Sequence, residues 1–401
     1  MSLRRLFGLG SLAVATLAIV ASSAVGCAAP SEEEGTPSSA SAVSERPPQF
    51  VLLAFDGSLN LDFWEESRAF AKSTNVKLTY FMSGPYFLPD AKKTMYHAPH
   101  HNAGASDIGF GGATANIPLR VQQVINARGE GHEMASHANG HYDGTKWTEE
   151  DWDSEFAQFN DLIFKSAANG GAPNLDIGFG PKDVIGFRAP LLGQGPGLYK
   201  TLAKNHFAYD TSKTSATNYW PEKINGIWNF PLAQIRIASG ANQGKKTLSM
   251  DYNFYYTQSA GVSKPAMKDA FKKEMLDTYM TYFQSNYFGN RAPVHIGHHF
   301  SRWNGGAYWE AMQAFAQRVC HQPEVKCVTY KELTEFMEAH ASMRGAYQRG
   351  EFTQLPRPPG AGDAQPVEEA VADDQLAAEG MVGDSSEAHE EVDENGNLVR
   401  E

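Results

Sequence analysis

The chain carries almost no net charge outside its last 44 residues. The formal net charge of −12 equals that of the segment 358–401 alone, which holds thirteen Asp or Glu residues against the single Arg400. Residues 1–357 therefore sum to about zero, and no basic stripe marks a surface for nucleic acid or another polyanion. We expect the acidic tail, placed at 343–401, to be disordered, because its composition is polar and strongly charged.

Cysteine is scarce as well, with only three in 401 residues. Cys320 and Cys327 are seven positions apart, and in an oxidising compartment this pair favours a small structural disulfide. A metal-binding pair is the weaker interpretation. The third cysteine, Cys27, ends an N-terminal segment with the features of an export signal.

The N-terminus lacks an uninterrupted apolar run of membrane-spanning length. Two Arg precede the apolar stretch 6–25, which Gly and Ser interrupt, and this favours an export signal over a retained transmembrane helix. The residues Ala-Val-Gly-Cys that end at Cys27 resemble a bacterial lipobox, in which the Cys is lipidated. We therefore expect a lipoprotein signal peptide over 1–27 and a flexible tether over 28–48. The protein would then be anchored by lipid in the cell envelope, at the outer membrane or facing the periplasm. An ordinary cleaved signal peptide is the alternative.

Residues 49–342 have the pattern of one α/β domain. Short apolar strands alternate with helical stretches, which predicts a parallel sheet, open or closed into a barrel. The expected strands are 50–55, 76–81, 133–136, 184–188, 208–210, 228–231, 293–298 and 326–329. The expected helices are 63–73, 117–127, 147–167, 197–205, 264–287 and 307–320. In barrels of this kind, polar residues at the carboxyl ends of strands are typical of catalysis.

Two of the segments at strand ends contain potential metal ligands or bases. His137 and His141 are spaced so that both imidazoles can turn toward one point, and neutral imidazole is a good Zn²⁺ ligand. Satisfied surface histidines explain this spacing equally well. Asp56 follows the first strand, where it is a base, a ligand or, together with Gly57, only a turn residue.

Two further segments contain groups that can stabilise charge or donate a proton. In Arg188-Ala-Pro190-Leu191, the Arg can hold a carboxylate by a bidentate pair, and the N–H after the Pro is a donor for an oxyanion. A structural ion pair is the alternative role for Arg188. The strand at 293–298 leads into His298 and His299, and a histidine there can act as a general acid near neutral pH.

Taken together and in this order, these segments resemble the polysaccharide deacetylases, which form carbohydrate esterase family 4 or the NodB-homology group. The chitin-deacetylase-like branch is the most similar, and the resemblance extends from about Val51 to Met337. The matching segments are Ala54-Phe55-Asp56-Gly57, His137-Ala-Asn-Gly-His141, Arg188-Ala-Pro190, Tyr209-Asp210 and Ile296-Gly-His-His299. The resemblance implies a distorted (β/α) barrel that hydrolyses acetyl groups with a divalent metal, Zn²⁺ before Co²⁺.

The resemblance also implies roles for single residues on the metal side of the site. His137 and His141 would bind the metal, with Asp56 as a further ligand. Asp56 also matches the general base that activates the water. Arg188 would orient Asp56, and the N–H of Leu191 would share the oxyanion with the metal.

On the other side of the site, His299 would protonate the leaving amine. Asp210 would tune that histidine, and Trp220 or Trp303 would form a wall of the sugar site. His298 is a rival for the role of acid, because adjacent residues of a strand face opposite sides and only one of the two can point into the site.

One departure from the family pattern affects the metal. The family has a second Asp, a metal ligand, where this chain has Gly57, and Ala138 replaces the Ser or Thr after the first metal histidine. Either Asp56 doubles as a ligand, or another residue completes the site, or the metal is held weakly. The loop segment His97-Ala-Pro-His100-His101 is one candidate source of a ligand, and an ordinary polar loop is the alternative.

These features favour a monomeric enzyme that removes N-acetyl groups from an N-acetylglucosamine polymer, namely peptidoglycan, chitin or an exopolysaccharide. Removal of O-acetyl groups from a polysaccharide is the alternative among esterases. The missing second Asp motivates a third hypothesis, a degenerate fold that binds glycan without turnover. Asp56, Arg188 and His299 argue against pure binding, which needs no acid and base.

Overall fold

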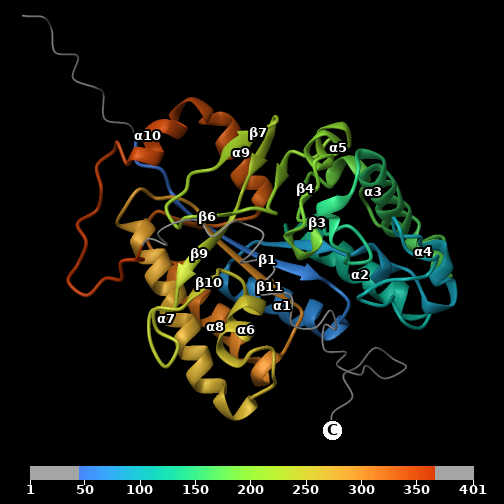
Figure 1. Ribbon diagram of the computed structural model, residues 1–401, viewed down its shortest axis with the longest axis horizontal. Helices are drawn as coiled ribbons and strands as arrows, with labels where there is room; N and C mark the ends of the chain where they lie inside the picture. Colours follow the sequence, from blue (N-terminus) through green and yellow to red (C-terminus); the bar gives the residue numbers. More distant parts are fainter. Residues whose placement is uncertain (1–44, 366–401) are drawn as a thin grey trace, which may run out of the picture. The chain divides into compact units, whose positions relative to one another are not determined.

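The computed structural model describes residues 45–365, which build one large curled sheet with helices packed around it (Figure 1). The strands pair in the order β11-β1-β2-β3-β4-β5-β8-β7, with β12 added beside β1, and only β7 and β8 are antiparallel. They are β1 (Gln49–Gly57), β2 (Leu78–Met82), β3 (Glu133–Ser136), β4 (Gly186–Phe187), β5 (Tyr209–Asp210), β7 (Glu222–Ile224), β8 (Ile227–Asn229), β11 (Val294–His299) and β12 (Val325–Cys327). Within the described residues no pairing joins β11 to β7, so the predicted distorted α/β barrel is confirmed in an incomplete form.

A second sheet of three strands was not expected from the sequence. It consists of β6 (Thr214–Ser215), β9 (Leu232–Arg236) and β10 (Lys246–Leu248), in the order β10-β9-β6. An isolated parallel bridge between Met250 and Gly297 connects the chain after β10 to β11. The second sheet therefore continues the wall of the incomplete barrel next to β11.

The principal helices lie between the strands, as the sequence pattern predicts. They are α1 (Leu61–Thr74), α2 (Asn116–Gly129), α3 (Glu149–Phe164), α4 (Ser166–Asn169), α5 (Leu198–Lys204), α6 (Asp251–Ser259), α7 (Lys268–Tyr287), α8 (Trp303–Val319), α9 (Tyr330–Ala339) and α10 (Arg344–Arg349). Local signals fix several ends: Asn60 caps α1 through its side chain, and Thr148 with Asp151 forms a capping box at α3. Helices α6, α9 and α10 were not predicted.

The central strand β1 separates two hydrophobic cores. Val51, Leu53 and Phe55 belong to the larger core, which also contains side chains of α1, α2, α3, α7 and α8. The alternate residues Leu52 and Ala54 face the smaller core inside the curl, with side chains of β5, β8 and α9. Since side chains alternate along a strand, Asp56 continues the row of Leu52 and Ala54 and belongs to the inner face.

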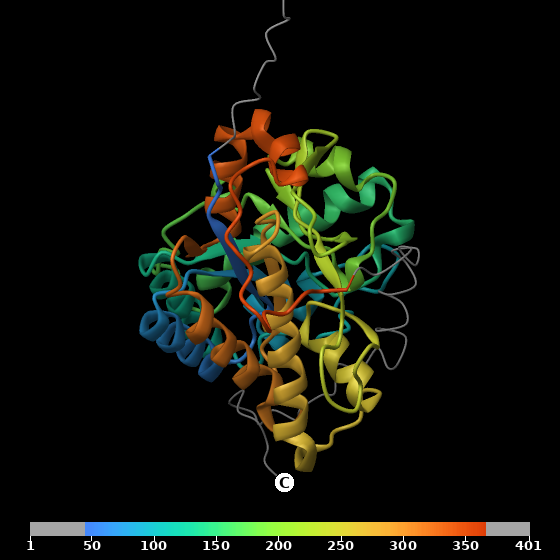
Figure 2. The same cartoon turned by 90° about the vertical axis from the view of Figure 1, so that its left-hand side faces the viewer.

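The folded body continues beyond the predicted start of the tail at residue 343. Helix α10 packs against the rest through Tyr347, whose ring centroid lies 4.9 Å from that of Trp220, and Phe352 is buried. Figure 2 shows the last described segment, in red, running along α7, where Gly362 donates a backbone hydrogen bond to the side chain of Gln284. The predicted start of the tail at 343 is therefore too early, because a few large apolar side chains, Tyr347 and Phe352 among them, anchor an otherwise polar segment.

Two further sequence predictions concern cysteine and the membrane. The Cys320–Cys327 disulfide is present and joins the end of α8 to β12. The predicted signal peptide, the lipobox at Cys27 and the tether as far as residue 44 lie outside the described residues. In the part of the chain that is described, no helix is both long and apolar enough to span a bilayer.

Candidate active site

The candidate site lies at the carboxyl ends of four strands of the large sheet. Asp56, near the end of β1, is the register partner of His299, the last residue of β11. His137 follows directly after β3, and Arg188 follows directly after β4. Because these strands are parallel, their carboxyl ends bring all four residues to the same edge of the sheet.

Asp56 and Arg188 form a buried ion pair at this edge. Arg188 Nη1 donates to Asp56 Oδ1 at 2.8 Å, and the two residues are 0% and 3% exposed. Arg188 Nε donates to Thr211 Oγ1 at 2.7 Å, and its guanidinium stacks 4.4 Å from the centroid of the Phe81 ring. Burial alone would lower the pKa of Arg188, but the Asp56 carboxylate raises it above the ordinary value. The expected contact is thus present, and Arg188 fixes one carboxylate oxygen of Asp56.

His137 is held in a form that can bind a metal. Its Nδ1 lies 2.8 Å from the backbone oxygen of Arg188, which can only accept, so the proton is on Nδ1 and the lone pair on Nε2. Burial lowers the pKa of His137 to about 3, against an opposing effect of Asp56, so the ring is neutral. The ring centroids of His137 and His141 are 5.3 Å apart.

Two buried side chains, whose role the sequence does not predict, hold the loop from His137 to His141 in place. The Glu155 carboxylate accepts a hydrogen bond from the Asn139 backbone N–H at 3.1 Å. The Tyr96 hydroxyl donates to the same carboxylate at 3.0 Å and accepts from the Gly140 N–H at 2.9 Å. Local sequence gives no signal for these contacts, because α3 and the segment after β2 are brought together only by the fold.

The carboxylate that contacts His299, the predicted general acid, is not the one that the sequence predicts. His299 Nδ1 lies 2.7 Å from Asp251 Oδ1, and the His299 N–H donates to Asp251 Oδ2 at 2.9 Å. Burial alone would raise the pKa of Asp251, but His299 and His298 outweigh it and hold the pKa well below its usual range. Asp251 is the first residue of α6, and the sequence pattern does not predict its role at the site.

Asp210, which was predicted to tune His299, lies in another network. It accepts hydrogen bonds from the Tyr199 hydroxyl at 3.0 Å and from Ser212 Oγ at 2.5 Å. Ser212 Oγ in turn accepts from the backbone N–H of Ala189 at 2.8 Å. The prediction for Asp210 is therefore wrong: this carboxylate supports the loop after Arg188, and Asp251 contacts His299.

The structure distinguishes the two adjacent histidines of β11. His299 is the register partner of Asp56 on the inner face, whereas His298 pairs with Phe55, whose side chain lies in the outer core. His298 is 0% exposed, and its Nε2 lies 3.3 Å from the Tyr279 hydroxyl. Strand alternation thus gives the site position to His299 and places His298 behind it, in contact with Asp251.

Aromatic side chains adjoin His299. The half-buried Trp303 has its ring centroid 5.3 Å from that of His299 and is stacked on Tyr255 at 5.2 Å with an interplanar angle of 4°. The ring centroid of Tyr252 lies 5.5 Å from that of Trp303. Trp220, the alternative wall residue, is fully buried against Tyr347 and therefore does not face the site.

Several residues around the site have left-handed backbone conformations. Non-glycine examples are Ser58, Ala138, His141 and Leu191, with φ between 51° and 86°. Such conformations are costly and tend to occur where function requires a fixed geometry. Leu191, whose N–H is the predicted oxyanion donor, lies on the turn after Pro190 with φ of 54°. This role of Leu191 stays a prediction.

Gly57 also has a left-handed backbone, with φ of 98°. A Cβ built on it would meet Tyr86 only at an ordinary contact distance of 3.5 Å, so space does not exclude a side chain. The conformation does disfavour one, because L residues rarely adopt such a φ. The departure from the family pattern at this position therefore coincides with a turn that suits glycine.

The site contains two side chains that are suitable as metal ligands. Neutral His137 with His141 is a suitable pair of imidazole ligands, and Asp56 has one oxygen committed to Arg188. Across residues 45–365, no group of three His, Cys, Asp or Glu side chains is arranged to hold a metal ion. A third protein ligand is thus not shown at the positions where the family pattern predicts it.

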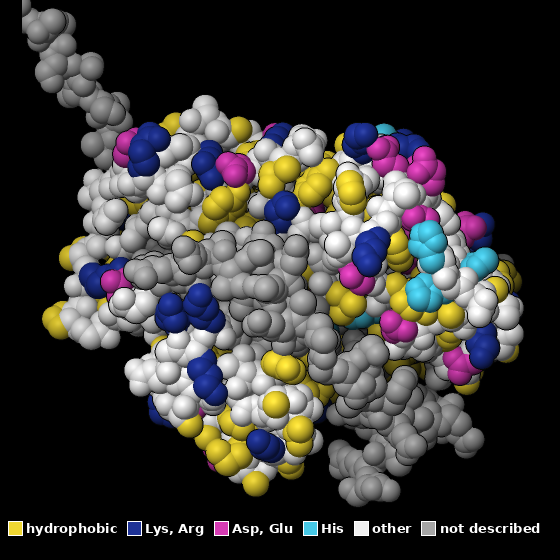
Figure 3. Space-filling model, in the orientation of Figure 1, with side chains coloured by type: hydrophobic (Ala, Val, Ile, Leu, Met, Phe, Trp, Pro, Cys, Tyr) yellow, Lys and Arg dark blue, Asp and Glu magenta, His cyan; other side chains and the backbone are white. Residues whose placement is uncertain are grey.

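The loop histidines proposed as an extra source of ligands lie on the surface. Histidine side chains gather beside acidic ones on the side of the molecule where Figure 1 places α3 (Figure 3). His97 and His100 are exposed, and His100 Nε2 lies 3.1 Å from Asp151 Oδ2. His101 stacks on Tyr142 with centroids 3.6 Å apart. Of the three, His101 therefore contacts Tyr142, the residue that follows His141 in the chain.

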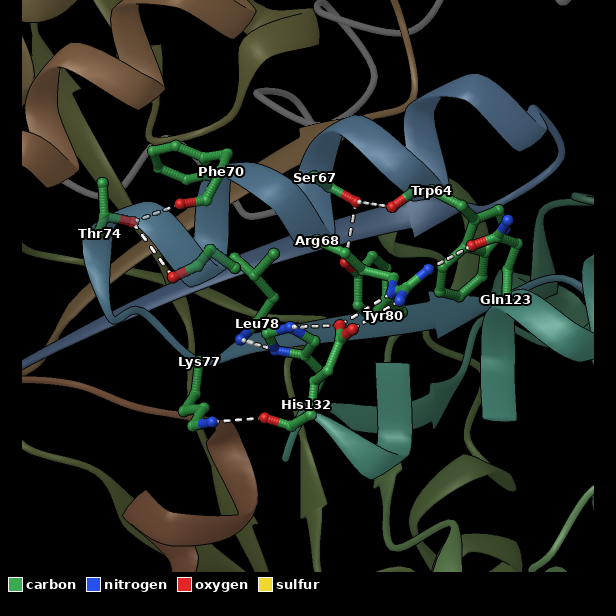
Figure 4. Close-up of polar contacts among 12 residues, drawn as sticks. Trp64, Ser67, Arg68, Phe70, Thr74, Lys77, Leu78, Tyr80, Gln123 and His132 are labelled. Carbon is green, nitrogen blue, oxygen red and sulfur yellow. Dashed lines mark hydrogen bonds and ion pairs between the residues drawn. The ribbon is translucent and has the colours of Figure 1, made fainter. Parts of the chain in front are cut away.

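A second polar cluster, drawn in Figure 4, is structural. His132 Nδ1 accepts from the Leu78 N–H at 3.1 Å, and burial lowers the pKa of His132 to about 4. Arg68 on α1 bonds to Gln123 on α2 at 2.6 Å. Ser67 and Tyr80 share a hydrogen bond of 2.9 Å. These contacts tie α1 and α2 to β2 and β3.

Buried Glu133, the first residue of β3, leads us to expect a measurable pH effect on stability. Burial raises its pKa from 4.5 to about 7, although Tyr209, Thr79 and the Lys331 N–H donate to it. The folded state then binds the proton more tightly than the unfolded state, so this group's stabilising contribution is complete below pH 4.5 and is lost as the pH rises toward 7. The loss is on the order of 3 kcal/mol.

The measurement is the free energy of unfolding between pH 4.5 and 8 for wild type and Glu133→Gln. Gln cannot titrate, so the wild-type advantage should shrink over this range. The exposed Glu335→Gln on α9 serves as a control and should follow the wild type. Parallel curves for wild type and Glu133→Gln would contradict the prediction.

Comparison with known proteins finds similar chains among solved structures. No family model matches the chain, and no curated protein matches it. Solved structures that are similar to it include polysaccharide deacetylases and members of carbohydrate esterase family 4.

Three of these structures illustrate the range. A protein from Mycobacterium smegmatis named as a polysaccharide deacetylase is 13% identical, with a TM-score of 0.46 over 79% of this chain and 99% of that one. Peptidoglycan deacetylase PdaC from Bacillus subtilis is 12% identical, with a TM-score of 0.38 over 76% and 99%. A carbohydrate esterase family 4 pseudoenzyme from Bacillus anthracis is 10% identical, with a TM-score of 0.38 over 72% and 66%.

Proposed function

We propose that the protein is a hydrolase that removes acetyl groups from N-acetylglucosamine units of a polysaccharide with the help of a divalent metal. The observation that carries this proposal is the pairing of Asp56 and His299, register partners on adjacent strands. Each is held by its own buried partner, Asp56 by Arg188 at 2.8 Å and His299 by Asp251 at 2.7 Å. Amide hydrolysis needs such a positioned base and acid.

In this scheme Asp56 takes a proton from water while the water oxygen forms a bond to the acetyl carbonyl carbon. Arg188 holds Asp56 in place through their buried ion pair, and the Leu191 N–H donates to the oxyanion. When the C–N bond breaks, His299 gives its proton to the leaving amine. Asp251 stabilises the protonated His299 before that transfer. The products are acetate and a free amine on the sugar.

A divalent metal, Zn²⁺ or Co²⁺, held by His137 and His141 would act as a Lewis acid on the acetyl carbonyl. The burial of His137 and its hydrogen bond to the Arg188 backbone support this assignment, because they keep the ring neutral with its Nε2 lone pair available.

The substrate class is inferred from the surroundings of His299. The half-buried rings of Trp303 and Tyr252 adjoin it, and aromatic faces pack well against the apolar faces of sugar rings. Because a lipid anchor is predicted at Cys27, we further propose that the substrate is a polymer of the cell envelope. An amide substrate is favoured over an ester, since an amine leaves only after it is protonated and the Asp251–His299 pair is suited to that step.

The test is acetate release by the purified full chain from N-acetylglucosamine oligomers and from acetylated xylan. We expect release from the N-acetylated oligomers that falls on treatment with a chelator and returns with Zn²⁺ or Co²⁺. Release only from acetylated xylan would assign an O-acetyl esterase instead. Release that is indifferent to chelator would contradict the metal-dependent mechanism.

Gly57 supports a second candidate, a glycan-binding protein without turnover, because the position that carries a metal ligand in the family has no side chain here. Oligomer binding without acetate release under any metal would favour it.

A further inference from the structure

The Asp251 carboxylate is shared between the two adjacent histidines at the end of β11. Its Oδ1 lies 2.7 Å from His299 Nδ1, and its Oδ2 lies 3.5 Å from His298 Nδ1. The backbone is fixed at this point, because the parallel bridge between Met250 and Gly297 holds the start of α6 against β11. The carboxylate therefore reaches side chains from both faces of this strand.

The charge of Asp251 is buried and needs partners that compensate it. Asp251 is 2% exposed, and within residues 45–365 its ion pairs involve only His298 and His299. It also accepts hydrogen bonds from the backbone N–H groups of His299 at 2.9 Å and Tyr252 at 2.7 Å. A buried charge is costly unless it is paired and hydrogen-bonded. Once His299 has given its proton to the leaving amine, the carboxylate depends on neutral donors such as His298.

The His298 ring presents a donor to this carboxylate. Both Asp251 oxygens accept hydrogen bonds from His299, so the carboxylate is an acceptor toward His298 as well. The proton of neutral His298 is therefore assigned to Nδ1, and Nε2 carries the lone pair. Nε2 lies 3.3 Å from the hydroxyl of Tyr279 on α7, which donates to it in this tautomer. Tyr279 thus fixes the form of His298 that directs a proton toward Asp251.

His298 and Tyr279 lie behind the site and are closed off from solvent. His298 is 0% exposed and adjoins the Phe55 ring on the outer face of the sheet. Tyr279 is also 0% exposed, among aromatic rings of α6 and α8. Apart from Asp251, no hydrogen-bond partner for His298 Nδ1 exists within the described residues. Buried polar atoms are rarely left unpaired, so this nitrogen is committed to the carboxylate.

We propose that His298 is a positioning residue of the hydrolase, which holds the Asp251 carboxylate toward His299 while this acid is without its proton. Tyr279 supports His298 by fixing its tautomer. Neither is a catalytic residue, since the proton given to the leaving amine comes from His299. This inference rests on the hydrolase proposed above and deepens it, because it names the residues that support the acid from behind.

Two replacements of His298 separate the roles of its two ring nitrogens. The amide nitrogen of Asn takes the place of Nδ1, so His298→Asn keeps a donor for Asp251. The amide of Gln reaches the place of Nε2, so His298→Gln keeps a contact with Tyr279 and loses that donor. Tyr282→Phe is the control for Tyr279→Phe, because Tyr282 is buried on the same helix and its hydroxyl contacts backbone atoms near the start of β11 instead.

The first readout is the NMR resonance of the His299 Nδ1 proton in the full chain with isotope-labelled histidine, assigned by its loss in His299→Gln. It reports the bond to Asp251 directly and needs no turnover. We expect it to move upfield in His298→Gln and, by less, in Tyr279→Phe, because the carboxylate is no longer held toward His299. We expect no change in His298→Asn or Tyr282→Phe.

The second readout is acetate release from N-acetylglucosamine oligomers. We expect His298→Gln to lower kcat about tenfold with KM unchanged, as for other residues that support a reacting group from behind. His298→Asn should stay close to the wild type. Circular dichroism and thermal unfolding verify that each variant is folded.

An unmoved His299 resonance or a wild-type kcat in folded His298→Gln would overturn the proposal, and so would equal losses in His298→Asn and His298→Gln. A downfield movement would show that His298 competes with His299 for the carboxylate, which also overturns it. A wild type that releases no acetate would refute the hydrolase, whereas the resonance in His298→Gln would still decide whether His298 holds Asp251.

Discussion

Replacement of Asp56 by Asn is expected to lower kcat for acetate release by about 10²–10⁴-fold, the usual contribution of a general base. Asn keeps the size of the side chain and an acceptor for Arg188 but cannot take a proton from water. The measurement is the rate of acetate release from N-acetylglucosamine oligomers at saturating substrate. The exposed Asp62→Asn, on the first turn of α1, serves as a control and should retain full activity.

The same variant has a foreseeable structural cost. Arg188 is fully buried, and the loss of its charged partner leaves a guanidinium without compensation. Thermal unfolding must therefore be measured beside the kinetics. A folded Asp56→Asn protein that retains wild-type kcat would remove Asp56 from the mechanism.

Replacement of Asp251 by Asn is expected to lower kcat by about 10–100-fold, as for other residues that support a reacting group from behind. The neutral amide no longer stabilises the protonated form of His299, so the alkaline limb of the pH–rate profile should move to lower pH. A purely structural defect would lower the rate without this displacement. The pH–rate profile of kcat is therefore the deciding measurement.

Asp210→Asn is the matched comparison for Asp251→Asn. Both carboxylates are buried at the edge of the sheet, but Asp210 bonds to Tyr199 and Ser212 and not to His299. We expect Asp210→Asn to leave the position of the alkaline limb unchanged. A displaced limb in Asp210→Asn, with none in Asp251→Asn, would contradict the assignment of the histidine partner.

Asp56 and Asp251 differ in how far the sequence alone predicts their place in the site. Asp56, Arg188 and His299 could be predicted because each follows or ends an apolar strand, and the carboxyl ends of parallel strands meet at one edge. Asp251 could not, because it lies on α6, outside the predicted strands, and an acidic residue in a helix's first turn is ordinary. Its contact with His299 depends on the bridge between Met250 and Gly297, which no local pattern reveals.

The fold, too, has parts that the sequence predicts and parts that it does not. The strands of the large sheet were predicted from short apolar runs, and β1 with its alternating cores matches its expected position closely. The second sheet and the folded segment around Tyr347 were missed, since their strands are short and their apolar residues sparse. In these parts, tertiary contacts determine the structure more than local preference.

Acetate release and oligomer binding by the wild-type protein can be measured in the same samples. N-acetylglucosamine oligomers would be incubated with the full chain loaded with Zn²⁺ or Co²⁺, and both bound oligomer and free acetate would be quantified. We expect acetate to appear with multiple turnovers and chelator to suppress its release. Bound oligomer with no acetate under either metal would contradict it and would make the protein a glycan-binding relative of the deacetylases.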